Sequence, residues 1–87
     1  MKIGFIGCGN MGSAMISGML KKGLYKEDEI IVSNLTEEGS KRSKEKLGVV
    51  TTLDNCEVVK NTKLVFLAVK PQFYEEVLNE VKRNWEW

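Results

Sequence analysis

The sequence predicts an α/β fold with a parallel β-sheet, and two features of its 87 residues carry this prediction. Short apolar runs that read as strands alternate with segments of helical periodicity, which is typical of βαβ units. The run within Lys63–Val69 is apolar after its first residue, as expected of a parallel strand covered on both faces. A chain of this length buries about 60–65% of its unfolded surface, so we expect one domain over residues 1–87.

Four segments are predicted to form strands. The first, Lys2–Ile6, is a short apolar run that stops at a glycine, and the second is Glu29–Ser33. A brief third strand is expected at Val49–Thr51, and Lys63–Val69 is the fourth. We expect a doubly wound parallel sheet, cut to about four strands in the order 3-2-1-4.

Helices are predicted between these strands from apolar spacing and from end signals. Asn10–Lys22 carries apolar or small residues at i, i+3, i+4 and i+7 spacing, which gives it one inward face. The helix that follows the second strand is polar and charged, so we expect it to be the least stable element. At helix N-termini, Thr36 and Asp54 are expected as N-caps, and Glu57 is expected to form a capping box with Asp54. Gly23 and Gly48 are expected to end the first and second helices. The last helix is expected to begin at Pro71 and to bury an apolar stripe made of Phe73, Val77, Leu78 and Val81.

Composition excludes several classes of function. Thirteen Lys and Arg against twelve Asp and Glu give a net charge of +1, which argues against a nucleic-acid partner or a polybasic membrane patch. The chain has no histidine, so Ser-His and Cys-His nucleophilic sites and imidazole-bound zinc are excluded. Cys8 and Cys56 are too few for a disulfide framework and lack metal-ligand spacing, which predicts reduced thiols in a cytoplasmic protein without a metal. The uncharged segment 3–20 is diluted by glycine, serine and asparagine, so we expect no membrane insertion.

The sharpest motif is the string Gly7-Cys8-Gly9-Asn10-Met11-Gly12, which has the spacing G-x-G-x-x-G. It lies at the end of the first strand and opens a helix, the context in which this spacing binds a dinucleotide. The first glycine permits the tight turn, the second lets the backbone approach a pyrophosphate, and the third lets the helix pack closely on its strand. Free N–H groups of the first helical turn then face the phosphates. A Rossmann-type fold is therefore predicted, and the alternative is a structural turn that binds nothing.

The end of the second strand bears on the choice of cofactor. An NAD site usually has Asp or Glu about 20 residues after the glycines, to bind the ribose 2′-hydroxyl. Here Ser33 and Asn34 occupy that region. A hydroxyl and an amide can donate hydrogen bonds to a 2′-phosphate that a carboxylate would repel, which favours NADP(H), with NAD(H) the less favoured cofactor. The alternative for these two residues is ordinary turn chemistry.

The fourth strand ends in Ala68-Val69-Lys70-Pro71, where proline forces the preceding residue into an extended conformation. In a 3-2-1-4 sheet, strands one and four flank the switch point at which doubly wound folds bind ligands. The turn after Val69 is therefore expected to face the glycine loop, near the nicotinamide end of the dinucleotide. A proline-initiated helix without a binding role is the alternative.

Together these segments resemble the amino-terminal half of pyrroline-5-carboxylate reductase, from Met1 to about Lys82. The resemblance is carried by Ile3–Met11, Ile31–Asn34 and the string from Phe66 to Gln72. Members of that family reduce the cyclic imine 1-pyrroline-5-carboxylate to proline, with hydride from a nicotinamide cofactor. Many bacterial members carry arginine where this chain has Leu35, which implies a weaker grip on the 2′-phosphate here.

The resemblance also implies a role for each matching position. The pyrophosphate would be held by Ile6, Gly7, Cys8, Gly9, Asn10 and Met11. The adenosine 2′-phosphate would meet Ser33 and Asn34, the adenosine would lie by Asn55, and the nicotinamide side would be lined by Ala68, Val69, Lys70 and Pro71. The family's substrate-binding groups belong to a carboxyl-terminal helical dimerisation domain that this chain lacks. No residue here therefore inherits a catalytic role, and we expect the 87-residue chain alone to be inactive.

Two other functions remain open. One is a stand-alone NADP(H)-binding module without turnover, and the other is the cofactor domain of a β-hydroxyacid dehydrogenase or of a deazaflavin-dependent NADP reductase. A four-stranded sheet would also leave the fourth strand at its margin, with unpaired backbone groups along an apolar edge. We expect this edge to promote self-association.

Overall fold

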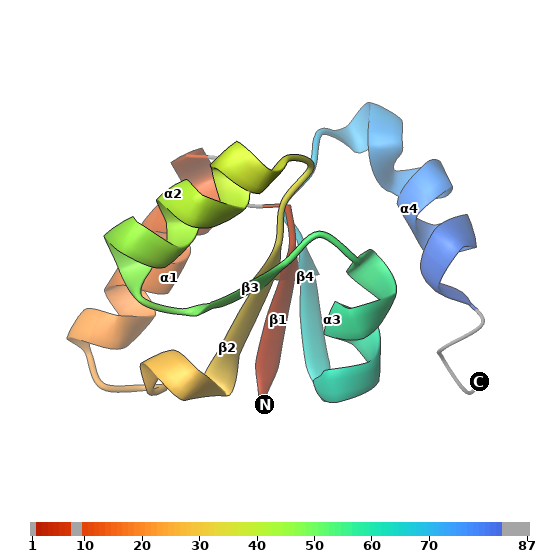
Figure 1. The fold of residues 1–87 in the computed structure, drawn as a ribbon. Helices are drawn as coiled ribbons and strands as arrows, with labels where there is room; N and C mark the ends of the chain where they lie inside the picture. The colour runs from red at the N-terminus through yellow and green to blue at the C-terminus, as the bar shows by residue number, and fades with distance from the viewer. Residues whose placement is uncertain (1, 8–9, 83–87) are drawn as a thin grey trace.

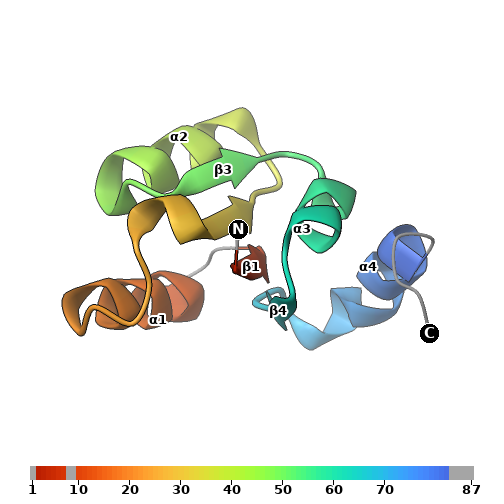
Figure 2. The same cartoon turned by 90° about the horizontal axis from the view of Figure 1, so that it is seen from below.

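The computed structural model describes residues 2–7 and 10–82, with the backbone alone for residues 10 and 11. Four parallel strands form one sheet in the order β3-β2-β1-β4, and α1 and α2 lie on one side of it while α3 and α4 lie on the other (Figure 1). The view along the strands in Figure 2 shows the same division into two helical layers. The predicted α/β fold and strand order are therefore confirmed. The bounds are β1 Ile3–Ile6, α1 Asn10–Lys21, β2 Ile30–Ser33, α2 Glu37–Leu47, β3 Val50–Thr52, α3 Asn55–Asn61, β4 Leu64–Leu67 and α4 Tyr74–Val81, with short 3-10 turns at Glu27–Glu29 and Pro71–Phe73.

Two apolar cores fill the spaces between the sheet and its helices. Alternate side chains of each strand point to opposite faces, so neighbouring residues of β1 and β2 contribute to different cores. Under α1 and α2 the buried side chains are Ile3, Phe5, Ile16, Ile30, Val32, Leu47 and Val49. Under α3 and α4 they are Ile6, Ile31, Val58, Val59, Val77 and Val81. Both central strands, β1 and β2, are buried along their whole length.

The element ends follow the expected capping chemistry with one exception. The Thr36 hydroxyl accepts a hydrogen bond from Gly39 N at 3.0 Å, and α2 ends at a left-handed Gly48. The Asp54 carboxylate accepts from Cys56 N at 2.9 Å, which confirms it as the cap of α3. The predicted capping box is wrong in its second half, because Glu57 and the Asp54 backbone N–H do not bond each other. Both instead bond the hydroxyl of Thr52, at 2.9 and 3.1 Å.

The fourth strand is shorter and more exposed than predicted. β4 runs over Leu64–Leu67. Leu64 is 47% exposed and the other three residues are half-buried, so the prediction of a strand covered on both faces is wrong. The physical reason is its position: β4 pairs with β1 on one side and is the last strand of the described sheet on the other. Strand β3, at the opposite margin, begins one residue later than predicted.

The last helix also packs differently from the prediction. The segment begins as a 3-10 turn at Pro71, where Phe73 N donates to Lys70 O at 2.9 Å, and becomes α-helical at Tyr74. Val77 and Val81 are buried as expected, whereas Phe73 and Leu78 are 40% and 39% exposed, so their placement in the inner stripe is wrong. Because α4 packs against α3, only one i, i+4 row of its side chains faces inward. Of the helices described in residues 2–7 and 10–82, none has the length and apolar character needed to span a membrane.

Candidate functional site

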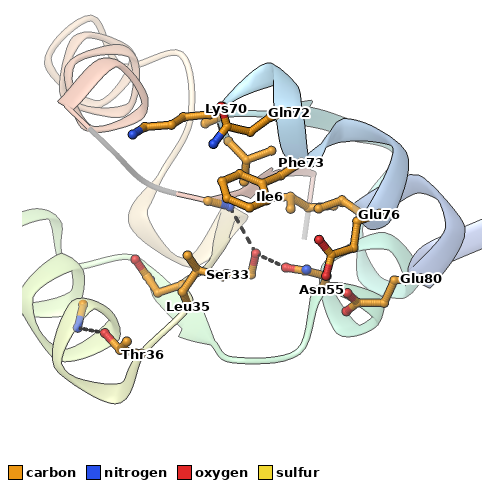
Figure 3. Close-up of a pocket in the computed structure, with 16 residues that line it drawn as sticks. Ile6, Ser33, Leu35, Thr36, Asn55, Lys70, Gln72, Phe73, Glu76 and Glu80 are labelled. Atoms are coloured by element: carbon orange, nitrogen blue, oxygen red, sulfur yellow. Dashed lines mark hydrogen bonds between the residues drawn. The ribbon is translucent and has the colours of Figure 1, made fainter.

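A cavity of about 630 Å³ opens at the carboxyl ends of the strands (Figure 3). This volume lies in the range of small-molecule and cofactor sites. Four segments far apart in the sequence meet there: the end of β1, the turn from β2 into α2, the first residue of α3, and the segment from β4 into α4. Parallel strands bring their carboxyl ends to one margin of the sheet, so the cavity follows from the topology.

The turn after β1 is fitted tightly against the end of β4. Gly7 has a φ of +86°, and a Cβ atom there would lie 2.7 Å from Val69 Cγ1 and 3.3 Å from the Ala68 carbonyl oxygen. A Cβ atom on Gly12 would lie 3.3 Å from Ala68 Cβ. Side chains at these positions would push the turn and the start of α1 away from the strands. Gly7 thus makes the tight turn that the sequence predicts for the first glycine, and Gly12 gives the close approach of α1 to the strand ends that is predicted for the third.

Ser33 forms hydrogen bonds with two other residues of the cavity, Gly7 and Asn55. Its side chain is buried, with 1% exposed, and its hydroxyl donates to Asn55 Oδ1 at 2.5 Å. The same hydroxyl oxygen accepts from Gly7 N at 3.2 Å, and the Ser33 carbonyl accepts from that N–H at 3.0 Å. The hydroxyl hydrogen is thereby engaged inside the protein. In this arrangement Ser33 positions the glycine turn and Asn55, a role that the sequence pattern did not reveal.

Asn34, the next residue, carries an unpaired donor. Its backbone N–H bonds Thr52 O at 3.0 Å, and its Oδ1 accepts from the Ser43 hydroxyl at 3.3 Å. Its Nδ2 is buried and has no hydrogen-bond partner among the described residues. A buried N–H without an acceptor costs about 1–3 kcal/mol, so an acceptor supplied by a ligand would be stabilised there. Asn34 also lines the cavity, beside Leu35 and Thr36 at the start of α2.

Charge is distributed unevenly around the cavity. At the β4 end lies Lys70, the one cation among the described lining residues. On the α4 side lie the carboxylates of Glu76 and Glu80. At the start of α2 the lining side chain of Leu35 is 88% exposed and offers no charge. An anionic ligand group is therefore repelled from the α4 side of the cavity and favoured on the opposite side, near Lys70 and the unpartnered Nδ2 of Asn34.

The structure brings most of the predicted site residues together. Cys8 and Gly9 lie outside the described residues, as do the side chains of Asn10 and Met11, whose backbone begins α1. Pro71 starts the 3-10 turn next to the cavity without lining it. The predicted residues that line the cavity are Ile6, Gly7, Ser33, Asn34, Asn55, Ala68, Val69 and Lys70.

Several lining residues were not anticipated from the sequence. They come from the start of α2, from the 3-10 turn after β4, and from α4. In the sequence, the i, i+4 spacing of the two α4 carboxylates beside an apolar row was the available signal for them. These residues are Thr36, Gly39, Gln72, Phe73, Glu76, Val77 and Glu80. Leu35 also lines the cavity, at the position where the resemblance implied a contact with the 2′-phosphate.

A parallel 3-2-1-4 sheet with a glycine turn after β1, and a cavity where that turn meets the ends of β2 and β4, defines a Rossmann-type nucleotide-binding domain. Comparison with models of protein families identifies the family within this class of nucleotide-binding domains. The chain belongs to the family described as "NADP oxidoreductase coenzyme F420-dependent", whose model matches residues 2–86.

Individual proteins that are similar to this chain point to one kind of enzyme within the family. The chain is 41% identical over 83 residues to a pyrroline-5-carboxylate reductase from Methanosarcina acetivorans, covering 95% of this chain and 31% of that protein. Among solved structures, a pyrroline-5-carboxylate reductase from Coxiella burnetii superposes with a TM-score of 0.87 at 39% identity, covering 94% of this chain and 30% of that one. The Plasmodium falciparum pyrroline carboxylate reductase with NADP bound superposes with a TM-score of 0.80 at 25% identity, covering 97% and 29%.

These comparisons confirm the resemblance to pyrroline-5-carboxylate reductases. The chain spans about three tenths of the length of the relatives it matches. The family description names a deazaflavin coenzyme, so it also accommodates the alternative of a deazaflavin-dependent reductase. The individual relatives favour the imine reductase.

Proposed function

We propose that this chain is the NADP(H)-binding part of a reductase that converts 1-pyrroline-5-carboxylate to proline. The observation that carries the cofactor assignment is the buried, unpartnered Nδ2 of Asn34 at the end of β2, a strand end that lacks a carboxylate. A donor in that position suits an acceptor such as a phosphate oxygen. The similarity to reductases, one of which holds NADP, supports the substrate and the cofactor.

Each part of the cavity suits one part of the cofactor. The main-chain N–H groups at the glycine turn and at the start of α1 would hold the diphosphate, where Cys8, Gly9, Asn10 and Met11 contribute backbone. Asn34 would bind the 2′-phosphate, with Ser33 holding Asn55 and Gly7 in place behind it. Asn55 would face the adenosine, and the segment Ala68–Pro71 would line the nicotinamide side. When bound, the reduced nicotinamide supplies the hydride for the imine carbon.

The chain matches only 31% of the length of its Methanosarcina acetivorans relative. We propose that residues 1–87 form one incomplete nucleotide-binding domain and that the groups contacting the imine lie in the remainder of the relatives' length. The free Cys56 thiol is compatible with a reducing compartment, and we assign the protein to the cytoplasm. A stand-alone binding module is the second candidate, and turnover by the chain joined to the carboxyl-terminal part of a relative separates the two.

Paired titration of NADPH and NADH by calorimetry tests the cofactor assignment. We expect NADPH to bind more tightly, because the two cofactors differ only in the 2′-phosphate. Equal affinities, or tighter binding of NADH, would contradict the cofactor assignment.

The reductase assignment is tested by NADPH oxidation in the presence of 1-pyrroline-5-carboxylate. We expect no turnover by the 87 residues and turnover when they are joined to the carboxyl-terminal part of a relative. A joined protein that binds NADPH and reduces a different substrate would contradict the choice of substrate.

Leu35→Arg is expected to tighten NADPH binding about tenfold and to leave the affinity for NADH within about twofold of the wild-type value. Leu35 is 88% exposed and lines the cavity beside Asn34, so a guanidinium there can reach the 2′-phosphate without disturbing the core. The matched control is Leu24→Arg, which adds the same charge at a 63% exposed position outside the cavity. If both variants change NADPH affinity equally, the effect is one of net charge, and the location of the 2′-phosphate is wrong.

We also propose that copies of the chain associate through the outer edge of β4. This strand is apolar and half-exposed and ends the described sheet. Light scattering at high concentration should show dimers or larger species, and Leu64→Lys should reduce them because it puts a charge at the edge. Leu24→Lys, also at an exposed leucine, should not. A monomeric wild-type chain under these conditions would refute the proposal.

A further inference from the structure

One side of the cavity is unlike the rest, because carboxylates line it. Glu76 and Glu80 lie one helical turn apart on α4 and both line the cavity. Their negative charge excludes the diphosphate and the 2′-phosphate of a dinucleotide from this side. A part of the ligand that carries no negative charge is favoured here, and a hydrogen-bond donor on it would be stabilised by a carboxylate.

The two carboxylates differ in their surroundings. The carboxylate of Glu80 has an oxygen within 4.8 Å of ligand atoms of both Asp54 and Cys56, and its backbone carbonyl accepts from Cys56 Sγ at 3.4 Å. It therefore lies at the start of α3. Glu76 has no hydrogen-bond or ion-pair partner among the described residues, and Figure 3 shows its side chain extended on the Asn55 side of the cavity. Its carboxylate is the acceptor that remains available.

A donor and an apolar surface accompany this acceptor. The Oδ1 of Asn55 accepts a hydrogen bond from the Ser33 hydroxyl, so the Asn55 Nδ2 is the group left to face a ligand. Phe73, which also lines the cavity, is 40% exposed, and an aromatic ring so exposed can stack on a flat base. Acceptor, donor and aromatic surface together suit a purine with an amino group beside a ring nitrogen. Adenine has that pattern, and hypoxanthine, with an oxygen in place of the amino group, does not.

We propose that Glu76 accepts a hydrogen bond from the amino group of adenine and sets the preference of the site for adenine over 6-oxopurines. This inference rests on the proposed NADP(H) function and goes beyond it by assigning a specificity-determining residue on α4. Hypoxanthine would turn its carbonyl oxygen toward the Glu76 carboxylate, so an attraction becomes a repulsion between two acceptors.

The test compares NADPH with its deamino analogue, which carries hypoxanthine in place of adenine and is otherwise identical. Binding to the 87-residue chain is measured by calorimetry, with circular dichroism to check the fold of each variant. We expect the wild-type chain to bind NADPH at least about tenfold more tightly than the analogue. Glu76→Gln should reduce this ratio to about threefold or less, because the amide can both accept and donate. The matched control is Glu75→Gln, an exposed neighbour on α4 that does not line the cavity, and it should keep the wild-type ratio.

The outcomes distinguish this inference from the proposed function. If wild type binds NADPH and the analogue equally well, the base-specific contact is wrong while the cofactor assignment stands. If Glu76→Gln keeps the full wild-type ratio, the preference arises elsewhere and the role of Glu76 is wrong. If the wild-type chain binds neither compound, the proposed function fails and this inference fails with it.

Discussion

Gly7→Ala is expected to lower NADPH affinity by about 30- to 100-fold and to destabilise the fold. Alanine pays about 1–2 kcal/mol at a positive φ, here +86°. Its Cβ atom would also lie 2.7 Å from Val69 Cγ1 and 3.3 Å from the Ala68 carbonyl oxygen, and such overpacking typically costs about 1–3 kcal/mol. A shift of the Val69 side chain would leave the approach to the Ala68 backbone, so we expect the turn to move away from β4 and to displace the N–H groups that we propose hold the diphosphate. A loss of about 2–3 kcal/mol in binding corresponds to the stated range.

Gly23→Ala is the matched control for this change. Gly23 has a similar φ of +71°, but an added Cβ atom would meet nothing within 4 Å. Urea denaturation should show a smaller loss of stability for Gly23→Ala, and calorimetry should show unchanged NADPH affinity. Wild-type affinity in Gly7→Ala, or equal losses of affinity in both variants, would show that the turn after β1 does not hold the cofactor.

Asn34→Asp is expected to reverse the cofactor preference. The change puts a carboxylate where the buried, unpartnered Nδ2 now lies, so a 2′-phosphate would meet a negative charge in a poorly solvated place. We expect NADPH affinity to fall about 10- to 100-fold. NADH affinity should hold or rise, since the new carboxylate can accept a hydrogen bond from the 2′-hydroxyl. The Ser43 hydroxyl can keep its bond to the remaining oxygen, so the local fold should persist.

Asn79→Asp provides the same change in net charge at a distance from the proposed contact. Asn79 is exposed on α4 and does not line the cavity. Both variants are titrated with NADPH and NADH under identical salt, because screening alters all such charge effects. An unchanged ratio of affinities in Asn34→Asp, or an equal change in Asn79→Asp, would mean that the 2′ end of the cofactor is recognised elsewhere.

The sequence predicted those features that depend on short stretches of chain. The caps at Thr36 and Asp54 follow from side chains that reach N–H groups two or three residues away. The left-handed Gly23 and Gly48 follow from the freedom of glycine at helix ends. Because parallel strands bring their carboxyl ends to one margin, placing the strands was enough to bring Gly7 and Asn34 to one cavity.

Features that depend on packing between distant elements were not predictable in the same way. The bond between Ser33 and Asn55 joins residues 22 positions apart, and it requires the exact placement of α3 over β2. The exposure of Phe73 and Leu78 was missed because an apolar spacing does not reveal which neighbour a helix will contact. In the structure α4 packs on α3, beside the sheet whose last described strand is β4. Two of the four apolar side chains predicted for its inner stripe therefore stay outside the core.

The structure of the chain in complex with NADP⁺, determined by crystallography, tests the central claim most directly. We predict that the diphosphate contacts the main chain between Gly7 and the start of α1 and that the 2′-phosphate contacts Asn34. The same structure would show whether the adenine amino group faces Glu76. A dinucleotide bound away from the cavity at the carboxyl ends of β1, β2 and β4 would contradict the account.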